Sequence, residues 1–356
     1  MVVSRMRQGK VWKRAFFPHF MIRLIFGRAE FRMNILFVTS TRIGDAVLST
    51  GLLSHLVSQY PDARITVACG VLPAPLFSAV PGVERVIPLT KRALAGHWLS
   101  LWSEVCTTMW DLVVDLRSSA LAWLLMARKR YVLRSGPDAK STHRVTELGG
   151  LFGLNPPPVP TLWSSDADKE AASVLIPGDA PVLGFGATAN WLPKIWPAEN
   201  FAALAERLTG PGAIMAGAHI AVFGGPDERE LARPLLEALP RDRVVDLVGG
   251  PRGVRGISVT AACLARCTLF VGNDSGLMHL AAAAGTPTVG LFGPSPPARY
   301  GPWGDHCAVA SSGVTYNELV GAADFDHRKT DNLMQSLSVD EVERVVLDLW
   351  SAKAVV

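Results

Sequence analysis

Short apolar runs alternate with longer amphipathic stretches along most of the chain. In the first half, runs rich in Val, Ile and Leu predict buried β-strands at residues 34–40, 64–69, 83–89 and 111–117. Between them, residues 45–60 and 72–80 space their apolar side chains three or four positions apart, as in a helix that packs on a sheet. Because strands and helices alternate, this half predicts a parallel sheet wrapped by helices.

The same alternation restarts after a stiff proline segment. The consecutive prolines Pro156–Pro158 can neither continue a helix nor join a central strand. Beyond them, strands are predicted at 181–188, 219–225, 243–250, 267–274 and 286–293, and helices at 197–208, 227–239, 258–266 and 276–284. The chain is therefore predicted to be an α/β protein with two parallel-sheet domains, residues 34–160 and 161–337, and a ligand cleft at the carboxyl ends of the strands. A last helix within 338–356 has no strand after it, and we expect it to cross back and pack on the first domain.

Residues 1–33 differ in composition from the rest of the chain. They hold eight Lys or Arg and one Glu, a net charge of +7, whereas the whole chain carries +4, so the remainder is mildly acidic. From Pro18 onward, polar residues fall at helical spacing on an apolar and aromatic segment, as in a helix that lies on an anionic membrane surface. The longest uncharged run is shorter than the roughly 20 residues of a spanning helix, and no small-residue cleavage site follows. For residues 1–32, two alternatives stay open: an arm packed on the body, and a true start at Met33.

Composition and charge exclude several classes of protein. With 49% hydrophobic and 19% charged residues among 356, the chain is typical of a folded globular protein. A mildly acidic body argues against nucleic-acid binding, which needs basic residues along a folded face. The cysteines are widely scattered without the spacing of a zinc site, which predicts reduced core thiols in a cytoplasmic protein; they are Cys69, Cys106, Cys263, Cys267 and Cys307.

The first candidate for chemistry is the loop that follows the opening strand. Gly44 permits close backbone approach in this loop, and Asp45 lies at the start of the next helix, facing the predicted cleft. A carboxylate in this position either caps the helix N-terminus or acts as a general base toward an acceptor hydroxyl. The spacing alone leaves both roles open.

A second polar loop follows the strand predicted at 181–188. Thr188, the loop backbone and the start of the next helix predict a site for an anionic group, with Lys194 as a mobile positive charge. A single loop lysine is often only solvated, but Lys194 lies between bulky residues in an otherwise uncharged loop.

The stretch VGNDSGLMHLAAAAGTPTVGLFGPSPPARYGPWG is the most informative part of the chain. Asp274, Ser275 and Gly276 lie at a strand-to-helix junction and His279 lies one turn into the helix, so a carboxylate, a hydroxyl, backbone amides and an imidazole are expected to converge. The following strand ends in a second tight turn that includes Gly293. Such a set of donors and acceptors suits a phosphate and a polyhydroxylated sugar. Taken singly, Asp274 could instead be a helix cap and His279 a packing residue.

Together these segments resemble glycosyltransferase family 9, the heptosyltransferases that add ADP-activated heptose to the inner core of bacterial lipopolysaccharide. RIGDAVLST is similar to the opening motif of the family, PKIWP to its Lys-x-Trp-Pro element, NDSGLMH to its Asp-[Ser/Thr]-Gly-x-x-His signature, and LFGPSPP with YGPWG to its closing loop. The resemblance covers most of the chain from Asn34 onward. Two features depart from it, Thr41-Arg42 in place of small hydroxyl residues and the segment before Met33, and they bear on the acceptor and the sugar more than on the reaction.

The resemblance implies the GT-B architecture, in which two Rossmann-like domains face each other, with the acceptor mainly on the first and the donor mainly on the second. It implies an inverting transfer with Asp45 as catalytic base and Lys194 at the donor phosphates. The expected donor-binding residues are Thr188, Lys194, Asp274, Ser275, Gly276, His279 and Gly293, and Gly44 and Arg42 are expected on the acceptor side. A looser match over GGPDERE places Asp227 or Glu228 near the nucleotide.

The same resemblance sets the expected partners. These are a nucleotide-sugar donor and a lipid-linked saccharide acceptor, with no further cofactor and no metal, since Lys194, Thr188 and helix N-termini would stabilise the charge of the leaving diphosphate. A basic segment at residues 1–32 would hold such an enzyme peripherally at the cytoplasmic face of the membrane.

Other functions could use a similar architecture. A nucleotide-sugar 2-epimerase needs no lipid acceptor, which would leave the basic segment without a purpose. A non-catalytic sugar-nucleotide-binding protein would keep the fold, but the presence of both Asp45 and Lys194 argues against it. A dinucleotide-dependent dehydrogenase is disfavoured, because no G-x-G-x-x-G follows the first strand and no acidic residue ends the second.

Overall fold

The structure is a computed structural model, and it describes residues 32–134, 136, 141–176, 178, 180–249, 256–312 and 332–354. The basic segment of residues 1–32, with the helix predicted from Pro18 onward, therefore lies outside the described residues, apart from Arg32. None of the helices in the described ranges combines the length and the apolar character needed to cross a bilayer.

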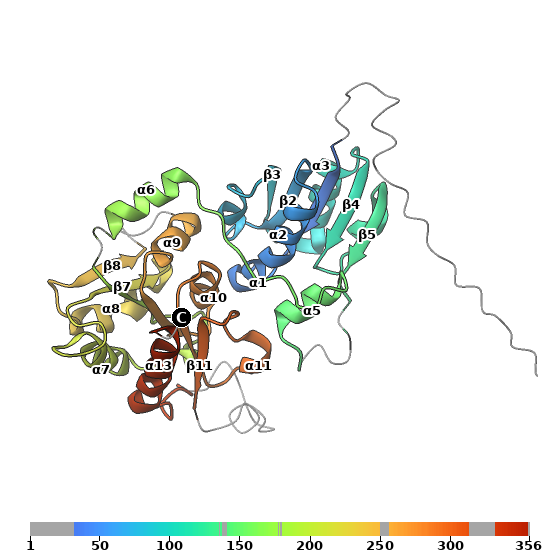
Figure 1. Cartoon of the computed structure of the whole chain (residues 1–356). Helices are drawn as coiled ribbons and strands as arrows, with labels where there is room; N and C mark the ends of the chain where they lie inside the picture. Colours follow the sequence, from blue (N-terminus) through green and yellow to red (C-terminus); the bar gives the residue numbers. More distant parts are fainter. Residues whose placement is uncertain are drawn as a thin grey trace, which may run out of the picture. The chain divides into compact units, whose positions relative to one another are not determined.

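The first sheet has five parallel strands in the order β3-β2-β1-β4-β5 (Figure 1). Four of them confirm predicted strands: β1(Asn34–Val38), β2(Arg64–Gly70), β3(Val83–Leu89) and β4(Trp110–Asp115). The fifth, β5(Ala127–Val132), was not predicted because its sequence ARKRYV is largely basic. As an edge strand it pairs on one side only, which lets its polar side chains reach water.

Two helices replace the single one predicted over 45–60, α1(Ile43–Leu48) and α2(Thr50–Gln59). The break falls at Ser49, whose hydroxyl donates to the Ala46 carbonyl oxygen at 2.7 Å and lies 2.7 Å from Oγ1 of Thr39. Because α1 starts before Asp45, the N-cap position belongs to Arg42, and Asp45 lies within the first turn.

Alternate residues of β1 face the two sides of the first sheet. Leu36 and Val38 pack under α3(Gly96–Val105) and α4(Leu121–Leu124), whereas Ile35 and Phe37 join the core on the side of α1 and α2. The other helical segments of this domain are η2(Ala74–Phe77), η3(Ala93–Ala95) and α5(Arg144–Gly150).

The second sheet has six parallel strands in the order β11-β10-β9-β6-β7-β8. Five confirm predicted strands: β6(Val182–Gly186), β7(His219–Gly224), β8(Val244–Val248), β9(Leu269–Asn273) and β10(Thr288–Phe292). The edge strand β11(Cys307–Ser311) is an addition. The helical segments are α6(Asp166–Leu175), η5(Leu192–Lys194), α7(Ala198–Thr209), η6(Pro226–Glu228), α8(Arg229–Ala238), α9(Ile257–Leu264), α10(Gly276–Ala283), α11(Pro297–Tyr300) and α13(Val339–Ala354).

The C-terminal helix α13 packs on the second domain, so the expectation that it would pack on the first is wrong. Its main contacts are with α7 and β11, and Figure 1 shows it beside them. Val342 and Val346 enter the core under α7. Asp340 and Glu343 both accept hydrogen bonds from Nη1 of Arg207 on α7, at 2.6 and 2.7 Å. The apolar side chains of α13 are thus buried within the second domain.

The proline segment Pro156–Pro158 joins the domains in an irregular path between α5 and α6, as predicted. It runs along α2 of the first domain, where a Cβ atom at Gly51 would overlap the Pro158 carbonyl oxygen. Just beyond it, the N–H of Thr161 donates to Oγ1 of Thr50 at 2.9 Å.

Two glycines allow a close contact between the domains, where α1 crosses α10. A Cβ atom at Gly44 would lie 2.9 Å from Cδ2 of His279, and one at Gly276 would lie 3.0 Å from Cγ2 of Ile43. Any larger residue would push the two helix N-termini apart. The carboxyl ends of β1 and β9, which lead into these helices, are thereby brought to one place.

Candidate functional site

Asp45 lies in the first turn of α1, on the wall of a polar cavity of about 300 Å³. The carboxylate receives no hydrogen bond from any residue that the structure describes, so capping of α1 does not occupy it. Free carboxylate oxygens at a cavity wall are what a general base requires.

The cavity is strongly polar, and three arginines contribute to its lining. They are Arg117, Arg144 and Arg299, and the hydroxyl-bearing residues Thr39, Ser40, Ser49, Ser118 and Tyr300 line it as well. Arg299 and Tyr300 belong to α11 of the second domain, whereas the other residues belong to the first. The cavity therefore lies between the domains, beside Asp45.

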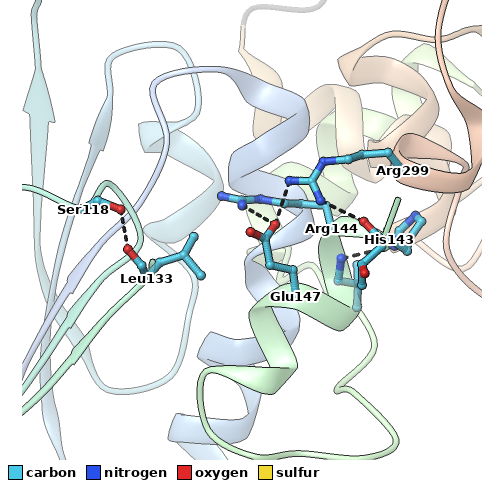
Figure 2. Close-up of polar contacts among 8 residues, drawn as sticks. Ser118, Leu133, His143, Arg144, Glu147 and Arg299 are labelled. Atoms are coloured by element: carbon cyan, nitrogen blue, oxygen red, sulfur yellow. Dashed lines mark hydrogen bonds and ion pairs between the residues drawn. The ribbon is translucent and has the colours of Figure 1, made fainter. Parts of the chain in front are cut away.

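A buried carboxylate orders the part of the wall that follows β4. Asp115 is fully buried, and it accepts hydrogen bonds from the N–H groups of Arg117 and Ser119, both at 2.8 Å. Ser118 has a left-handed backbone, φ 52°, and its hydroxyl donates to the Leu133 carbonyl oxygen (Figure 2). These bonds fix the turn that presents Arg117 to the cavity.

Glu147 joins two of the arginines behind the cavity wall. Its Oε2 accepts from Nη1 of Arg144 and from Nη2 of Arg299, each at 2.7 Å, and Figure 2 shows the two guanidinium groups converging on it. The three side chains are only 16%, 12% and 10% exposed for Arg144, Arg299 and Glu147. Burial alone would raise the pKa of the Glu147 carboxyl, but the hydrogen bonds and charges of the two arginines lower it. One carboxylate thus holds an arginine from each domain.

His143 and Arg299 add further bonds between the domains at the same place. His143 caps α5, with its Nδ1 accepting from the N–H of Val145 at 3.2 Å. Its Nε2 therefore carries the proton and donates to the Gly301 carbonyl oxygen at 3.0 Å. Nη1 of Arg299 donates to the Thr142 carbonyl oxygen at 2.8 Å.

Replacing Glu147 by Gln should destabilise the protein by about 2 kcal/mol, because two buried guanidinium groups lose their shared anion. Since the folded-state pKa of Glu147 is lowered, its contribution is present above the ordinary carboxyl pKa and is lost as the pH falls. Urea unfolding at neutral pH and at about pH 4 should show the larger difference from wild type at neutral pH. Glu341→Gln, which removes an exposed partner of Arg344, is the control and should have little effect. Equal stability of Glu147→Gln and wild type at neutral pH would contradict this role.

On the donor side, Lys194 and Asp274 form an ion pair. Nζ of Lys194 lies 2.5 Å from Oδ2 of Asp274, with side chains 22% and 9% exposed. The loop is fixed on both flanks, since Trp196 N–H donates to Oδ1 of Asn273 at 3.0 Å and Nε1 of the buried Trp196 donates to the Leu337 carbonyl oxygen at 2.8 Å. Lys194 is therefore a held cation at the carboxyl ends of β6 and β9, and Asp274 is its partner, not a cap of α10.

The N-terminus of α10 gathers polar atoms that have no partner among the described residues. These are Oγ of Ser275, Nδ1 of His279 and Nδ2 of Asn273, all buried. Burial lowers the pKa of His279 to about 4, although the negative charges of Asp274 and Asp45 act to raise it. The imidazole is therefore neutral at pH 7. Unsatisfied buried groups are costly unless a ligand supplies their partners, which distinguishes His279 from a packing histidine.

Three other predicted residues lie apart from this group. Oγ1 of Thr188 donates to Oε2 of Glu228 at 2.8 Å, so that its hydroxyl is committed to a carboxylate. Gly293 packs tightly against the sulfur of Met334. Arg42 is exposed at the N-cap of α1 and is not part of the cavity lining.

Glu228 and Asp227 differ in their surroundings. Glu228 also accepts from the N–H of Gly225 at 2.8 Å and is half-buried beside Thr188, whereas Asp227 is exposed. Of the two residues suggested for the nucleotide side, only Glu228 is held in place near a predicted donor residue.

The cysteines do not contribute to this site. All five are free, and Cys69, Cys263 and Cys267 are buried, which raises the pKa of each thiol, to about 12 for Cys69 and Cys263. Within the described ranges, His, Cys, Asp and Glu side chains do not form any group of three or more that could hold a metal ion.

The sequence prediction missed Arg117, Arg144, Glu147 and Arg299. A signal existed for two of them, because Arg144 and Glu147 are three apart in a helix, where opposite charges commonly pair. Arg299 lies in the closing loop that was singled out, but its partner is 152 residues earlier in the chain. Such a pairing depends on the tertiary structure.

Comparisons with known proteins agree with the fold and with the family that the motifs resemble. The sequence profile described as "Glycosyltransferase family 9 (heptosyltransferase)" matches residues 114–322. Lipopolysaccharide heptosyltransferase 2 of Salmonella typhimurium is 28% identical over 305 residues, covering 74% of this chain and 84% of that protein. Lipooligosaccharide heptosyltransferase 2 of Haemophilus influenzae is 24% identical over 318 residues, covering 78% and 88%. The solved structure of E. coli ADP-heptose LPS heptosyltransferase II has a TM-score of 0.70 at 23% identity and covers 90% of this chain and 100% of that one.

Proposed function

The chain belongs to glycosyltransferase family 9, and we propose that within this family it transfers a heptose from ADP-heptose to a lipid-linked saccharide of the lipopolysaccharide core. The observation that carries the proposal is the free carboxylate of Asp45 at the wall of a polar cavity between the two domains of a GT-B fold. The sugar and the acceptor follow the names of the relatives, and ADP follows the name of the structural neighbour. The family match favours a transferase over the nucleotide-sugar 2-epimerase considered from the sequence.

We propose an inverting, single-displacement transfer. Asp45 takes the proton of the acceptor hydroxyl as that oxygen forms a bond to the anomeric carbon of the donor. The bond from the anomeric carbon to the phosphate oxygen breaks on the opposite face, and ADP leaves with the electron pair. Inversion follows because attack and departure occur on opposite faces in a single step.

The leaving ADP gains negative charge, which Lys194 and the backbone N–H groups at the start of α10 are placed to stabilise. On donor binding, we propose that Lys194 exchanges Asp274 for the diphosphate. The unpartnered Ser275 hydroxyl and His279 Nδ1 would then bond the donor. Because protein groups supply this charge, the transfer is proposed to need no metal, and full activity in the presence of EDTA is the expected result.

On the acceptor side, we propose that the saccharide enters the cavity beside Asp45. Arg117, Arg144 and Arg299 line it and would bind anionic groups of the acceptor, because guanidinium groups make paired hydrogen bonds to carboxylates and phosphates. A lipid-linked acceptor places the enzyme peripherally at the cytoplasmic face of the membrane, with residues 1–32 as a basic attachment.

The proposal is tested by calorimetric binding of ADP-heptose, ADP-glucose, UDP-glucose and GDP-mannose to the full chain without added metal. Selective binding of ADP-heptose is expected. Preference for a UDP- or GDP-sugar would contradict the donor but keep the reaction type. Failure to bind any of the four would contradict the transferase proposal and favour a non-catalytic family member.

A further inference from the structure

The outer side of α3 and α4 exposes a group of large apolar side chains, here called the apolar patch. Trp123, Leu124 and Met126 are 59%, 67% and 50% exposed, and Leu99, Trp102 and Leu94 are 69%, 38% and 103% exposed. A soluble protein rarely leaves so many large apolar residues together on its surface unless they bind something.

These residues lie on one side of the first domain. The inner sides of α3 and α4 both bury apolar residues against the same face of the first sheet: Leu101 and Val105 from α3, and Leu121 and Ala122 from α4. The remaining side chains of the two helices must therefore point outward in the same general direction. Nε1 of Trp102 donates to the Leu124 carbonyl oxygen at 3.4 Å, which ties the two parts of the apolar patch together.

The segment that carries Trp123, Leu124 and Met126 is held firmly in place. Arg130 on β5 donates to three carbonyl oxygens around it, those of Ala122 at 2.7 Å, Leu125 at 2.6 Å and Ala127 at 2.9 Å. The buried side chain of Leu125 anchors the segment from below. The exposed apolar residues therefore lie on a segment that hydrogen bonds and core packing hold in one conformation.

Basic residues border the apolar patch. Lys91 and Arg92 are exposed next to η3, which carries Leu94, and Arg128 is 63% exposed two residues after Met126. The acidic residues of the same elements are each paired with an arginine, Glu104 with Arg85 and Asp111 with Arg128. Lys91 and Arg92 therefore leave the border of the apolar patch with a net positive charge.

The first strand of the sheet begins at the same edge. Asn34 is the first residue of β1. Its Nδ2 donates to the Met109 carbonyl oxygen at 3.3 Å, and its N–H donates to Oδ2 of Asp111 at 2.9 Å. Asp111 is the partner of Arg128, and Trp110 N–H donates to the Met126 carbonyl oxygen at 2.9 Å. The start of β1 is thus fixed beside Met126 and Arg128.

We infer that the apolar patch is a membrane-docking surface that inserts into the interface of a bilayer containing anionic lipid. Tryptophan and leucine bury well at the level of the head groups, and the Lys and Arg border is complementary to anionic phosphates. A protein partner would have to match the shape of the apolar patch as well as its basic border, whereas an anionic bilayer matches both without any specific shape. The docking rests on the folded body of the first domain and does not depend on which sugar is transferred.

The test is flotation of the full chain with vesicles of phosphatidylethanolamine and phosphatidylglycerol, compared with vesicles of phosphatidylcholine alone. Trp123→Ser combined with Leu124→Ser should lower the partition coefficient for the anionic vesicles about tenfold or more. Lys91→Ala combined with Arg92→Ala should lower it several-fold at low salt and less at high salt. Val174→Ser, which changes an apolar residue 74% exposed on α6 of the second domain, is the matched control and should change nothing.

Two outcomes would overturn this inference. One is unchanged binding of the Trp123→Ser, Leu124→Ser variant to anionic vesicles. The other is equal binding of the wild-type chain to the anionic vesicles and to the phosphatidylcholine vesicles at low salt. The readout is lipid binding, so a failed heptose transfer leaves it interpretable. Unchanged ADP-heptose binding by the same variant would show that the donor site stays folded.

Discussion

Asp45→Asn should lower the turnover number about 10³-fold while ADP-heptose still binds with nearly its original affinity. The amide has the size of the carboxylate but cannot accept the proton of the acceptor hydroxyl. Asp45 has no hydrogen-bond partner among the described residues, so its replacement breaks no contact that supports the fold. Steady-state kinetics with both substrates, and calorimetry with the donor alone, separate the two effects.

The control for Asp45 is Asp166→Asn, which changes a fully exposed carboxylate at the start of α6. It should transfer sugar at the wild-type rate. Turnover of Asp45→Asn within a few-fold of wild type would remove Asp45 from the role of base. The aspartate would then be a residue of the cavity wall that serves only in acceptor binding.

Lys194→Met should weaken donor binding and lower the turnover number together, with an overall loss in kcat/KM for ADP-heptose of about 10²–10³-fold. The cation is placed to meet the diphosphate in the ground state and to stabilise the charge that grows on it as the bond breaks. An effect on both constants distinguishes this role from simple attraction of the donor, which would change KM alone.

Lys194→Met also leaves the nearly buried Asp274 without its partner, so its unfolding temperature must be measured beside its activity. Lys194→Arg keeps the charge and provides a second variant that retains the ion pair. It should recover donor binding and part of the turnover. If Lys194→Met is folded and responds to donor as wild type does, Lys194 is a structural partner of Asp274 and no more.

Much of the fold could be predicted because buried parallel strands produce continuous apolar runs. All nine predicted strands are present, and the proline segment lies between the domains as expected. The missed strands β5 and β11 are both edge strands, where one side meets solvent and the apolar pattern is weak. The position of α13 was mispredicted because an apolar stripe in the sequence does not say which domain will cover it. In the structure Val342 and Val346 pack under α7, and Arg207 pairs with Asp340 and Glu343.

The candidate site was predictable where its residues follow directly after strands. Asp45, Lys194, Asp274 and His279 all lie just beyond the carboxyl end of a central strand, and parallel topology alone brings such positions to one edge. Glu147 and Arg299 could not be found in this way, because their meeting depends on how one domain lies against the other. The sequence predicted that Thr188 would bind an anionic group of the donor. In the structure the Thr188 hydroxyl donates to Glu228, which the sequence only loosely placed near the nucleotide.

The contact of Gly44 with His279, and of Gly276 with Ile43, also bears on how the molecule can move. If one domain rotates relative to the other, atoms close to the axis of rotation move least, and this glycine crossing is a close contact between the two domains at α1 and α10. Asp45 is the next residue after Gly44, so its carboxylate would keep its position relative to the start of α10 while the walls around it swing. The enzyme could then open to admit a large acceptor and close again while the Asp45 carboxylate keeps its position beside the start of α10.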